Sequence, residues 1–450
     1  MRSLGGVVLV SVQGLCAAGQ TGAKDAIQAR IERVTACLRP LVYVKTDPCV
    51  SLVDRMEALH VPGVSVAVIH DGKIEWARGF GVEKVGGAAV TPETMFQAGS
   101  ISKPVAAMAI LRLVQDGKLK LDEDVNKELV SWKLPESAAA NSKPVTLREL
   151  LTHTGGTTVH GFPGYGQGEQ VPTIVQVLDG EKPANTPAVR VEKEPGTRWN
   201  YSGGGITIAQ LMAMDSTKEP FPKLMHDYVL GPIGMTHSTY EEPLPESMTA
   251  NAATPYNADG TPVKGGAHTY PEMAAAGLWT TPSDIARYVI ENQRSLEGKA
   301  NHVLSQAMTK EMMTPGLGSW GLGVQIGGGE GDRYFEHGGD DAGFEAFFVG
   351  YENHGDGAVV MTNAQGGSRV ADELVRSIAT EYGWPDFRGK ERTMVKVEPA
   401  ALQTDLGIYD LTPRGELTFH SGGSRELSGA GMREFLDVKA AVIASGNEIR

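Results

Sequence analysis

The stretch at residues 63–82, GVSVAVIHDGKIEWARGFGV, has the pattern of two adjacent strands. Val64, Val66 and Val68 alternate along its first half, and Asp71-Gly72 supplies a tight turn before apolar residues resume on the return. Alternating apolar residues around an Asp-Gly pair are a strong signal for a β-hairpin. We therefore expect an antiparallel hairpin near the beginning of the fold.

Strand signals return late in the chain, as RYFEHGG, GFEAFFVGY and GAVVMTN between residues 333 and 363. A helix pattern, VADELVRSIATEYGW, follows at 370–384, and the chain from about 120 to 270 is rich in helix and loop signals. Strands at both ends with helices between them predict an α/β fold of two lobes. One lobe is an antiparallel sheet flanked by helices, the other is a helical lobe inserted in the chain, and a cleft lies between them.

Composition narrows the function. The chain has 450 residues, 21% of them charged, and a formal net charge of −13 without an evident basic stripe. A nucleic-acid partner is therefore not expected. No apolar run approaches the roughly 20 residues of a membrane span.

The first residues, MRSLGGVVLVSVQGLCAAGQTG, join one arginine to an apolar stretch and a patch of small residues. This pattern predicts a signal peptide at residues 1–19 and a periplasmic or secreted protein. Cys16 leaves with that segment, so Cys37 and Cys49 remain. The sequence leaves open whether these two pair or stay as free thiols.

The stretch FQAGSISKPVAAMAILRLVQDGK, at residues 96–118, raises a chemical question. Ser100 and Lys103 are three residues apart, a spacing that puts them on one face of a helix. Arg112 is the only charge in the body of that helix, so the helix is expected to be buried. Burial and the positive end of the helix dipole both disfavour an ammonium group, so Lys103 can accept the proton of Ser100. The alternative for a lone S-x-x-K is that the serine caps the helix and the lysine reaches solvent.

Two further segments favour the catalytic interpretation. In RWNYSGGGITIAQLM, Tyr201 precedes Ser202 and three glycines, which allow close approach of a backbone or a ligand. In YFEHGGDDAGFEAFFVGY, His337 and two glycines are expected to end a strand, with the glycines open to a substrate backbone. His153, in LTHTGG, is interpreted as a structural histidine, and Trp279 and Trp320 as core residues or cleft walls.

Together these segments resemble the class C β-lactamase and penicillin-binding family of serine hydrolases, which includes esterases and D-peptidases. The resemblance covers about residues 60–385, through phrases such as HVPGVSVAVIHDGK, FQAGSISK, LLTHTGG, LGPIGMTHSTY, AAAGLWTTPSDIARY and HGGDDAGF. Their order along the chain makes the combination specific, although each phrase alone is weak. The resemblance implies a hydrolase domain at 20–385, a linker at 386–400 and a small, lipocalin-like β appendage at 401–450.

The same resemblance implies roles for single residues. Ser100 is the expected nucleophile, Lys103 its partner base, and Tyr201 a general base or acid. The backbone N–H groups of Ser100 and Asp340 would form the oxyanion hole. The remaining expected substrate-binding and motif positions are Gly203, His337, Gly338 and Gly339.

Two positions depart from the family pattern. The second motif usually ends as Tyr-x-Asn, but Gly203 stands at its third place, and His337 stands where β-lactamases usually have lysine. Both changes favour an esterase or D-peptidase acting on small esters or D-amino-acid-type amides. A β-lactamase is the first alternative, and a penicillin-binding receptor that is acylated without turnover is the second. No cofactor or metal site is expected, because clustered His and Cys ligands and nucleotide-binding motifs in a fitting context are missing from the sequence.

Overall fold

A computed structural model describes residues 13–300, 302–393, 407–410 and 416–419. The first helix, α1, runs from Gln13–Ala36 through the cleavage site expected near residue 19, while residues 1–12 lie outside the described part. The signal peptide therefore stays a prediction. No helix within the described ranges is long and apolar enough to cross a bilayer.

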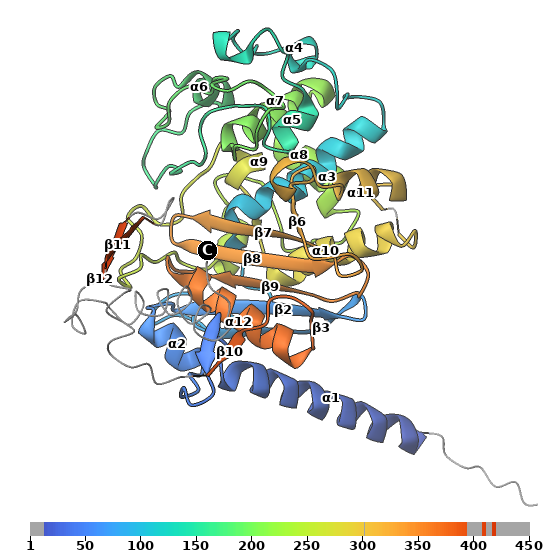
Figure 1. The fold of residues 1–450 in the computed structure, drawn as a ribbon, viewed down its shortest axis with the longest axis vertical. Helices are drawn as coiled ribbons and strands as arrows, with labels where there is room; N and C mark the ends of the chain where they lie inside the picture. The colour runs from blue at the N-terminus through green and yellow to red at the C-terminus, as the bar shows by residue number, and fades with distance from the viewer. Residues whose placement is uncertain (1–12, 301, 394–406, 411–415, 420–450) are drawn as a thin grey trace, which may run out of the picture.

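The central sheet has six antiparallel strands in the order β3-β2-β9-β8-β7-β6. Its strands are β2 (Gly63–His70), β3 (Lys73–Gly81), β6 (Gln325–Gly327), β7 (Tyr334–Asp341), β8 (Phe344–Tyr351) and β9 (Gly357–Thr362). The expected hairpin is present, and β2 pairs on its other side with β9, placing Val66 opposite Val360. The prediction of one antiparallel sheet built from the two ends of the chain is thus confirmed (Figure 1).

Strand β2 is buried on both faces, and its alternation divides two hydrophobic layers. Val64, Val66 and Val68 belong to the cluster beneath the helix α12 (Gly367–Glu381), whereas Ala67 and Ile69 belong to the larger cluster on the other face. Side chains of a strand point alternately to opposite faces, so one apolar run serves both layers. The sheet is consequently the middle layer of a three-layer lobe.

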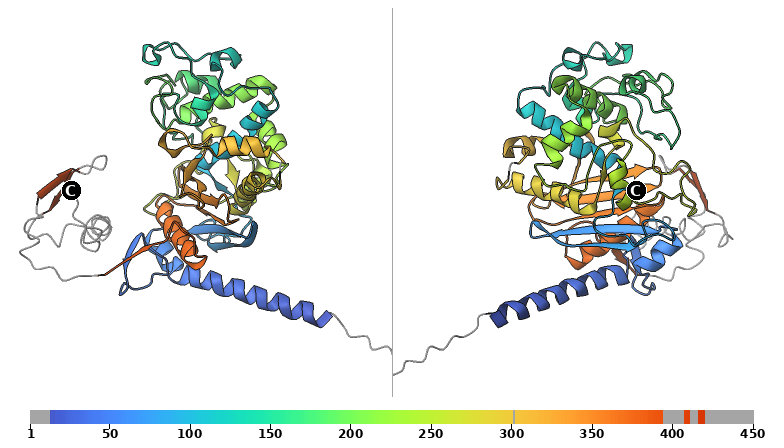
Figure 2. Two further views of the ribbon diagram at one scale, coloured as in Figure 1. Left: turned by 45° about the vertical axis from the view of Figure 1, so that its right-hand side comes forward. Right: turned by 180° about the vertical axis from the view of Figure 1, so that it is seen from behind.

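Helices cover both faces of the sheet. The outer layer consists of α12 with α1 and α2 (Leu52–Ala58), and α10 (Pro282–Leu296) packs on the inner face. The remaining helices are α3 (Ser102–Gln115), α4 (Val125–Glu128), α5 (Leu147–Leu151), α6 (Ile174–Asp179), α7 (Gly203–Thr217), α8 (Phe221–Met225), α9 (Met273–Ala276) and α11 (Gln306–Met312). Figures 1 and 2 show α3 to α9 gathered in a second lobe above the sheet. The two-lobe prediction is confirmed.

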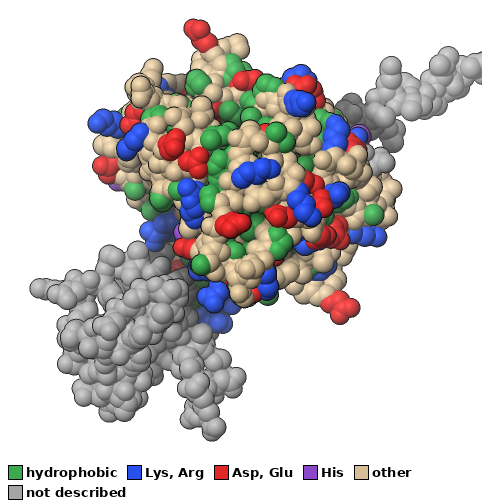
Figure 3. All heavy atoms as spheres, turned by 90° about the horizontal axis from the view of Figure 1, so that it is seen from above, with side chains coloured by type: hydrophobic (Ala, Val, Ile, Leu, Met, Phe, Trp, Pro, Cys, Tyr) green, Lys and Arg blue, Asp and Glu red, His purple; other side chains and the backbone are tan. Residues whose placement is uncertain are grey.

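The surface of the helical lobe mixes both signs of charge. Seen from above, Lys and Arg side chains are interspersed with Asp and Glu (Figure 3). Several are paired, as in the contacts of Lys120 with Glu123 and of Arg148 with Asp122. This face lacks the single-sign basic patch of a nucleic-acid-binding surface.

Small paired strands lie outside the main sheet. Strands β4 (Phe96–Gln97) and β5 (Trp279–Thr280) pair with each other next to the start of α3. Strand β1 (Val42–Val44) pairs in parallel with β10 (Lys390–Arg392), so part of the expected linker is a strand. Strands β11 (Gly407–Asp410) and β12 (Glu416–Phe419) form an antiparallel pair within the expected appendage, whose other residues lie outside the described part.

Cys37 and Cys49 form a disulfide, which settles the alternative that the sequence left open. The bond closes a loop between α1 and α2, with a Cα–Cα distance of 4.7 Å. Arg55 of α2 reaches across to Glu373 of α12 through charge-assisted hydrogen bonds. These contacts attach the N-terminal segment to the helix that follows the last strand of the sheet.

Candidate active site

Ser100 lies at the start of α3, as expected, but within a single 3₁₀ turn, Gly99–Ile101, that precedes the α-helix. Gly99 has φ +52° and lies so close to β7 that a Cβ there would be 2.4 Å from the Asp340 nitrogen. Positive φ and this close approach both require glycine. The Gly99 N–H donates to the buried Asp341 carboxylate (3.0 Å), which anchors the turn that carries Ser100.

Lys103 is buried beneath that turn. Its Nζ donates to Ser100 Oγ and to the Ala275 carbonyl of α9, each at 2.8 Å. The lysine side chain is buried, so the alternative that Lys103 extends to solvent is wrong for this chain. The sequence pattern did not indicate that Ala275, in the AAAG segment, contacts Lys103, because the contact is made by its backbone carbonyl.

Tyr201 approaches the pair from the helical lobe. Lys103 Nζ lies 5.1 Å from the centre of the Tyr201 ring. The tyrosine is held by Ser202, whose Oγ caps α7 by accepting the Gly205 N–H (3.0 Å) and donates to the Thr158 carbonyl (2.8 Å). The residue that immediately precedes the N-cap of α7 is therefore placed over a lysine of α3.

The glycine run after Ser202 serves packing. A Cβ on Gly203 would be 2.8 Å from the Phe162 ring, and one on Gly204 would be 2.6 Å from the Thr158 carbonyl. Neither residue lines the cavity beside Ser100. The space in which an asparagine side chain would begin is thus occupied by Phe162, which the sequence did not indicate.

His337 is on β7 and is buried, but the expected end of the strand there is wrong, because β7 continues to Asp341. Gly338 and Gly339 still pair with residues of β8, so the strand continues through both glycines. Burial, followed by the nearby Lys103, lowers the pKa of His337 to about 3. Its Nδ1 is within 2.6 Å of the Gly338 carbonyl, so a neutral ring donates there. The site has a neutral imidazole where β-lactamases usually have a cation.

His153 belongs to the site, although the sequence suggested only a structural role. Its ring centre is 4.3 Å from that of Tyr201, and Trp320 contacts both rings at 5.1 and 5.8 Å. His153 Nδ1 accepts the Ser202 N–H, and burial lowers the pKa of His153 well below its ordinary value. Trp320 also lies 5.4 Å from His337. Aromatic rings and neutral histidines thus enclose Tyr201 on the side away from the cavity.

The backbone of β7 lies along the serine turn. Strand β6 pairs only with residues 334–336, so from His337 onward β7 has β8 on one side and the Gly99–Ile101 turn near the other. A Cβ on Gly339 would be 2.0 Å from the Ala98 carbonyl, which explains the second glycine of this motif. The N–H of Asp340 and that of Ser100, in the first turn of its helix, are therefore candidates to hold an oxyanion.

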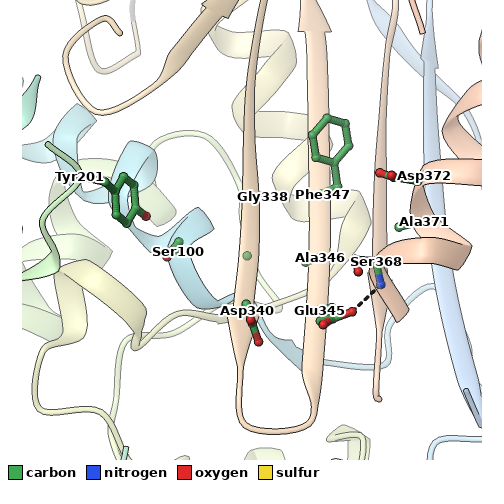
Figure 4. A pocket seen from close by; sticks show the side chains of 11 residues that line it. Ser100, Tyr201, Gly338, Asp340, Glu345, Ala346, Phe347, Ser368, Ala371 and Asp372 are labelled. Carbon is green, nitrogen blue, oxygen red and sulfur yellow. Dashed lines mark hydrogen bonds between the residues drawn. The ribbon is translucent and has the colours of Figure 1, made fainter. Parts of the chain in front are cut away.

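Ser100, Tyr201, Gly338, Gly339 and Asp340 all line one cavity of about 300 Å³ (Figure 4). Lys103 and His337 lie behind its wall. The described residues contain no group of three or more His, Cys, Asp or Glu side chains that could hold a metal ion. What the arrangement offers is a nucleophile, a buried amine, a phenol and backbone N–H groups.

Comparison with known proteins gives a family match and a fold match. A family model described as Beta-lactamase matches residues 51–381. A Beta-lactamase of Pseudomonas fluorescens is 29% identical over 271 residues, which cover 58% of this chain and 70% of that protein. Protein flp of Staphylococcus aureus (strain N315) is 25% identical over 248 residues, covering 53% of this chain, and the match spans only 44% of its own length. The structure of the octameric penicillin-binding protein homologue from Pyrococcus abyssi superposes with a TM-score of 0.62 at 24% identity, covering 74% of this chain and 76% of that one.

Proposed function

This chain belongs to the beta-lactamase family of serine hydrolases, and we propose on that premise that it hydrolyses small esters or D-amino-acid-type amides through an acyl-Ser100 intermediate. The observation that carries the proposal is the 2.8 Å contact between Ser100 Oγ and the buried Lys103 Nζ, at the wall of an open cavity. A serine so placed has both a proton acceptor and access to substrate, as nucleophilic catalysis requires.

The reaction proceeds in two stages. Ser100 Oγ attacks the carbonyl carbon while its proton passes to Lys103, with Tyr201 as the second candidate acceptor. The carbonyl oxygen becomes an oxyanion held by the N–H groups of Ser100 and Asp340. The tetrahedral intermediate expels the alcohol or amine, which takes the proton. Water then adds to the acyl carbon while the same base takes its proton. The acyl–Oγ bond breaks, the base returns the proton to Ser100 Oγ, and the acid is released.

Two features support esters or D-amides over β-lactams. Burial lowers the pKa of His337 to about 3, so near pH 7 its imidazole is neutral and the position supplies no cation to a substrate carboxylate. Gly203 presents no amide group, and Phe162 fills the place where one would begin. Each feature removes a partner that an acylamino, carboxylate-bearing substrate would use, and a site without those partners is more tolerant of small esters.

The test compares kcat/KM for p-nitrophenyl butyrate, a D-alanyl amide and a cephalosporin on the wild-type chain. We expect the ester or the D-amide to be turned over much faster than the cephalosporin. Ser100→Ala should abolish turnover and covalent labelling by a fluorophosphonate, and Ser131→Ala, a change of an exposed serine, should do neither.

Three other outcomes would each change the assignment. Preference for the cephalosporin would promote the β-lactamase alternative. Stoichiometric acylation without turnover would identify a receptor. Labelling that survives in Ser100→Ala would show that another residue is the nucleophile.

We further propose that the mature chain works in an oxidising compartment, the periplasm or the exterior. The Cys37–Cys49 disulfide supports this, because such bonds persist mainly where thiols are not kept reduced. Fractionation of the native host, with detection of the disulfide by mass spectrometry, tests it.

A further inference from the structure

The cavity beside Ser100 is a groove that extends across the sheet. Ser100 and Tyr201 lie at one end, and the other end is bounded by β8 and the first turns of α12 (Figure 4). Its remaining lining residues are Gly338, Gly339, Asp340, Glu345, Ala346, Phe347, Ser368, Ala371 and Asp372. Any substrate held at Ser100 can therefore send a substituent over β7 toward α12.

Gly338 is the point at which the groove crosses β7. It is exposed, its φ is not positive, and a Cβ there would meet only the Ala346 carbonyl, at 3.9 Å. The backbone thus has no need of glycine at this position, unlike Gly99 and Gly339. Its cross-strand partner is Phe347, and cross-strand partners project from the same face of a sheet. A side chain at 338 would stand in the groove, so the bare strand keeps the path open.

The lining of the groove is part apolar and part acidic. Phe347 and Ala371 supply apolar surface, whereas Asp340, Glu345 and Asp372 are acidic, and no Lys, Arg or His is among the described residues that line the groove. In Figure 4 the carboxyl groups of Asp340 and Glu345 lie at one end of the groove and that of Asp372 near Phe347.

The acidic side chains are only partly neutralised by their neighbours. Asp340 accepts from the uncharged Gln365 amide (2.9 Å), and Glu345 accepts the Ser368 N–H at the start of α12. Asp372 is 56% exposed, and among the described residues its one cationic partner is Arg376, one helical turn further along and 3.2 Å away. Three carboxylates against one guanidinium leave a negative field over an apolar floor.

We propose that this groove receives a substrate arm with an apolar stem and a protonated amine at its end. The preferred substrates are then esters or amides that carry an alkylammonium substituent, a narrower class within the proposed function, on which this inference rests. Negative walls attract such a cation, and the aromatic face of Phe347 adds to that attraction. The same walls repel the carboxylate of a β-lactam.

The experiment uses ester pairs of matched shape on the full chain. For the acyl side the pair is p-nitrophenyl 6-aminohexanoate and p-nitrophenyl heptanoate. For the leaving-group side the pair is 6-aminohexyl butyrate and heptyl butyrate, whose hydrolysis is measured by the release of acid. We expect kcat/KM to favour the ammonium ester about tenfold in at least one pair, with the preference falling as salt is added. The pair that shows the preference identifies which half of the substrate lies in the groove.

Substitutions at Asp372 test the cause. Removing one exposed charge changes an interaction by roughly two- to fivefold, so Asp372→Asn should lower the ammonium-to-neutral ratio by about that factor. Asp372→Lys should lower it further. Glu93→Gln removes an exposed carboxylate of equal charge outside the groove and should leave the ratio unchanged.

A second readout separates this inference from the function on which it rests. The rate of covalent labelling of Ser100 is compared for a fluorophosphonate with a 6-aminohexyl chain and one with a heptyl chain. If no ester is turned over but the amino probe labels faster, the hydrolase proposal fails and the groove proposal stands. If esters are turned over but neither ratio exceeds one, or Asp372→Lys leaves the ratios unchanged, the groove proposal is overturned.

Discussion

Single residues at this site depend on backbone contacts that hold them. Ser100 is held by a turn that only glycine at position 99 allows, and Lys103 by the Ala275 carbonyl on a different helix. The two side chains contact each other directly. A pair held in this way does not lose conformational entropy again when the substrate binds.

Lys103→Ala tests the base. We expect kcat/KM for the preferred ester to fall by roughly 10²–10⁴-fold, the usual contribution of a positioned general base. Lys118→Ala, which removes a lysine whose Nζ donates to the Tyr228 hydroxyl at the surface, is the control. A Lys103→Ala enzyme with wild-type kcat/KM would show that the lysine only packs.

The neutral His337 predicts an acid-dependent stability. In the folded chain its pKa is about 3, whereas in the unfolded chain it is near 6.5, so only the unfolded chain takes up the proton between these values. The titration of His337 does not reduce the free energy of unfolding well above pH 6.5, and it reduces that free energy progressively as the pH falls toward 3. Between pH 7 and pH 5 the loss is about 2 kcal/mol.

His337→Gln should therefore lose about 2 kcal/mol less than the wild type between pH 7 and pH 5. The measurement is urea unfolding at both pH values, since the other titrating groups are common to the two proteins. His226→Gln, at a side chain that is 71% exposed, is the control. Equal pH dependence of wild type and His337→Gln would mean that His337 titrates normally in the fold.

At the scale of elements, the first turn of α7 decides what the second motif can hold. The turn is packed against the loop that carries Phe162, so glycine is needed at 203 for space, since its φ is not positive. Restoring the asparagine of the family pattern is therefore a problem of packing and not of backbone conformation.

Gly203→Asn alone should destabilise the protein by about 1–3 kcal/mol, as overpacking usually does. Gly203→Asn with Phe162→Ala relieves the contact and should recover most of the lost Tm. In this double variant we expect the ratio of kcat/KM for the cephalosporin to that for p-nitrophenyl butyrate to rise, because the asparagine restores the amide of the family pattern at this position. Phe162→Ala alone is the matched control. If the ratio is the same in the control and the double variant, the residue at position 203 does not determine substrate choice.

At the scale of the whole molecule, the two ends of the chain are joined around the sheet. The β2–β3 hairpin completes the sheet formed by β7, β8 and β9, and α1 and α2 pack with α12 on its outer face. The disulfide closes the loop between α1 and α2 in that outer layer. The active site is at the opposite end of this arrangement, where β7 meets the helical lobe.

Replacing both cysteines tests this separation. A disulfide across 12 residues stabilises by about 3 kcal/mol through the smaller entropy of the unfolded chain. Cys37→Ser with Cys49→Ser should lower the Tm by several degrees while kcat/KM at 25 °C stays that of the wild type. Dithiothreitol should lower the Tm of the wild type alone. A loss of kcat/KM in the folded double variant would show that the outer layer positions the site.

Sequence patterns predict the features that depend on neighbouring residues. Ser100 and Lys103 share a helix face because residues three apart are neighbours on a helix. The alternation of Val64, Val66 and Val68 predicts a strand, because strand side chains alternate between two faces. The order of the motifs along the chain, with their flanking phrases, was enough to predict the family and the two-lobe fold, and it indicated Ser100, Lys103, Tyr201 and His337 as candidate site residues.

The surroundings of those residues depend on how distant segments of the chain pack together. The neutral state of His337, the aromatic neighbours of Tyr201, the carbonyl of Ala275 and the open path over Gly338 all arise where distant segments pack together. Local spacing is set by covalent geometry and short-range hydrogen bonds, which a sequence pattern records. Desolvation and cross-chain proximity are set by which segments exclude water from each other, and no pattern of neighbouring residues encodes that.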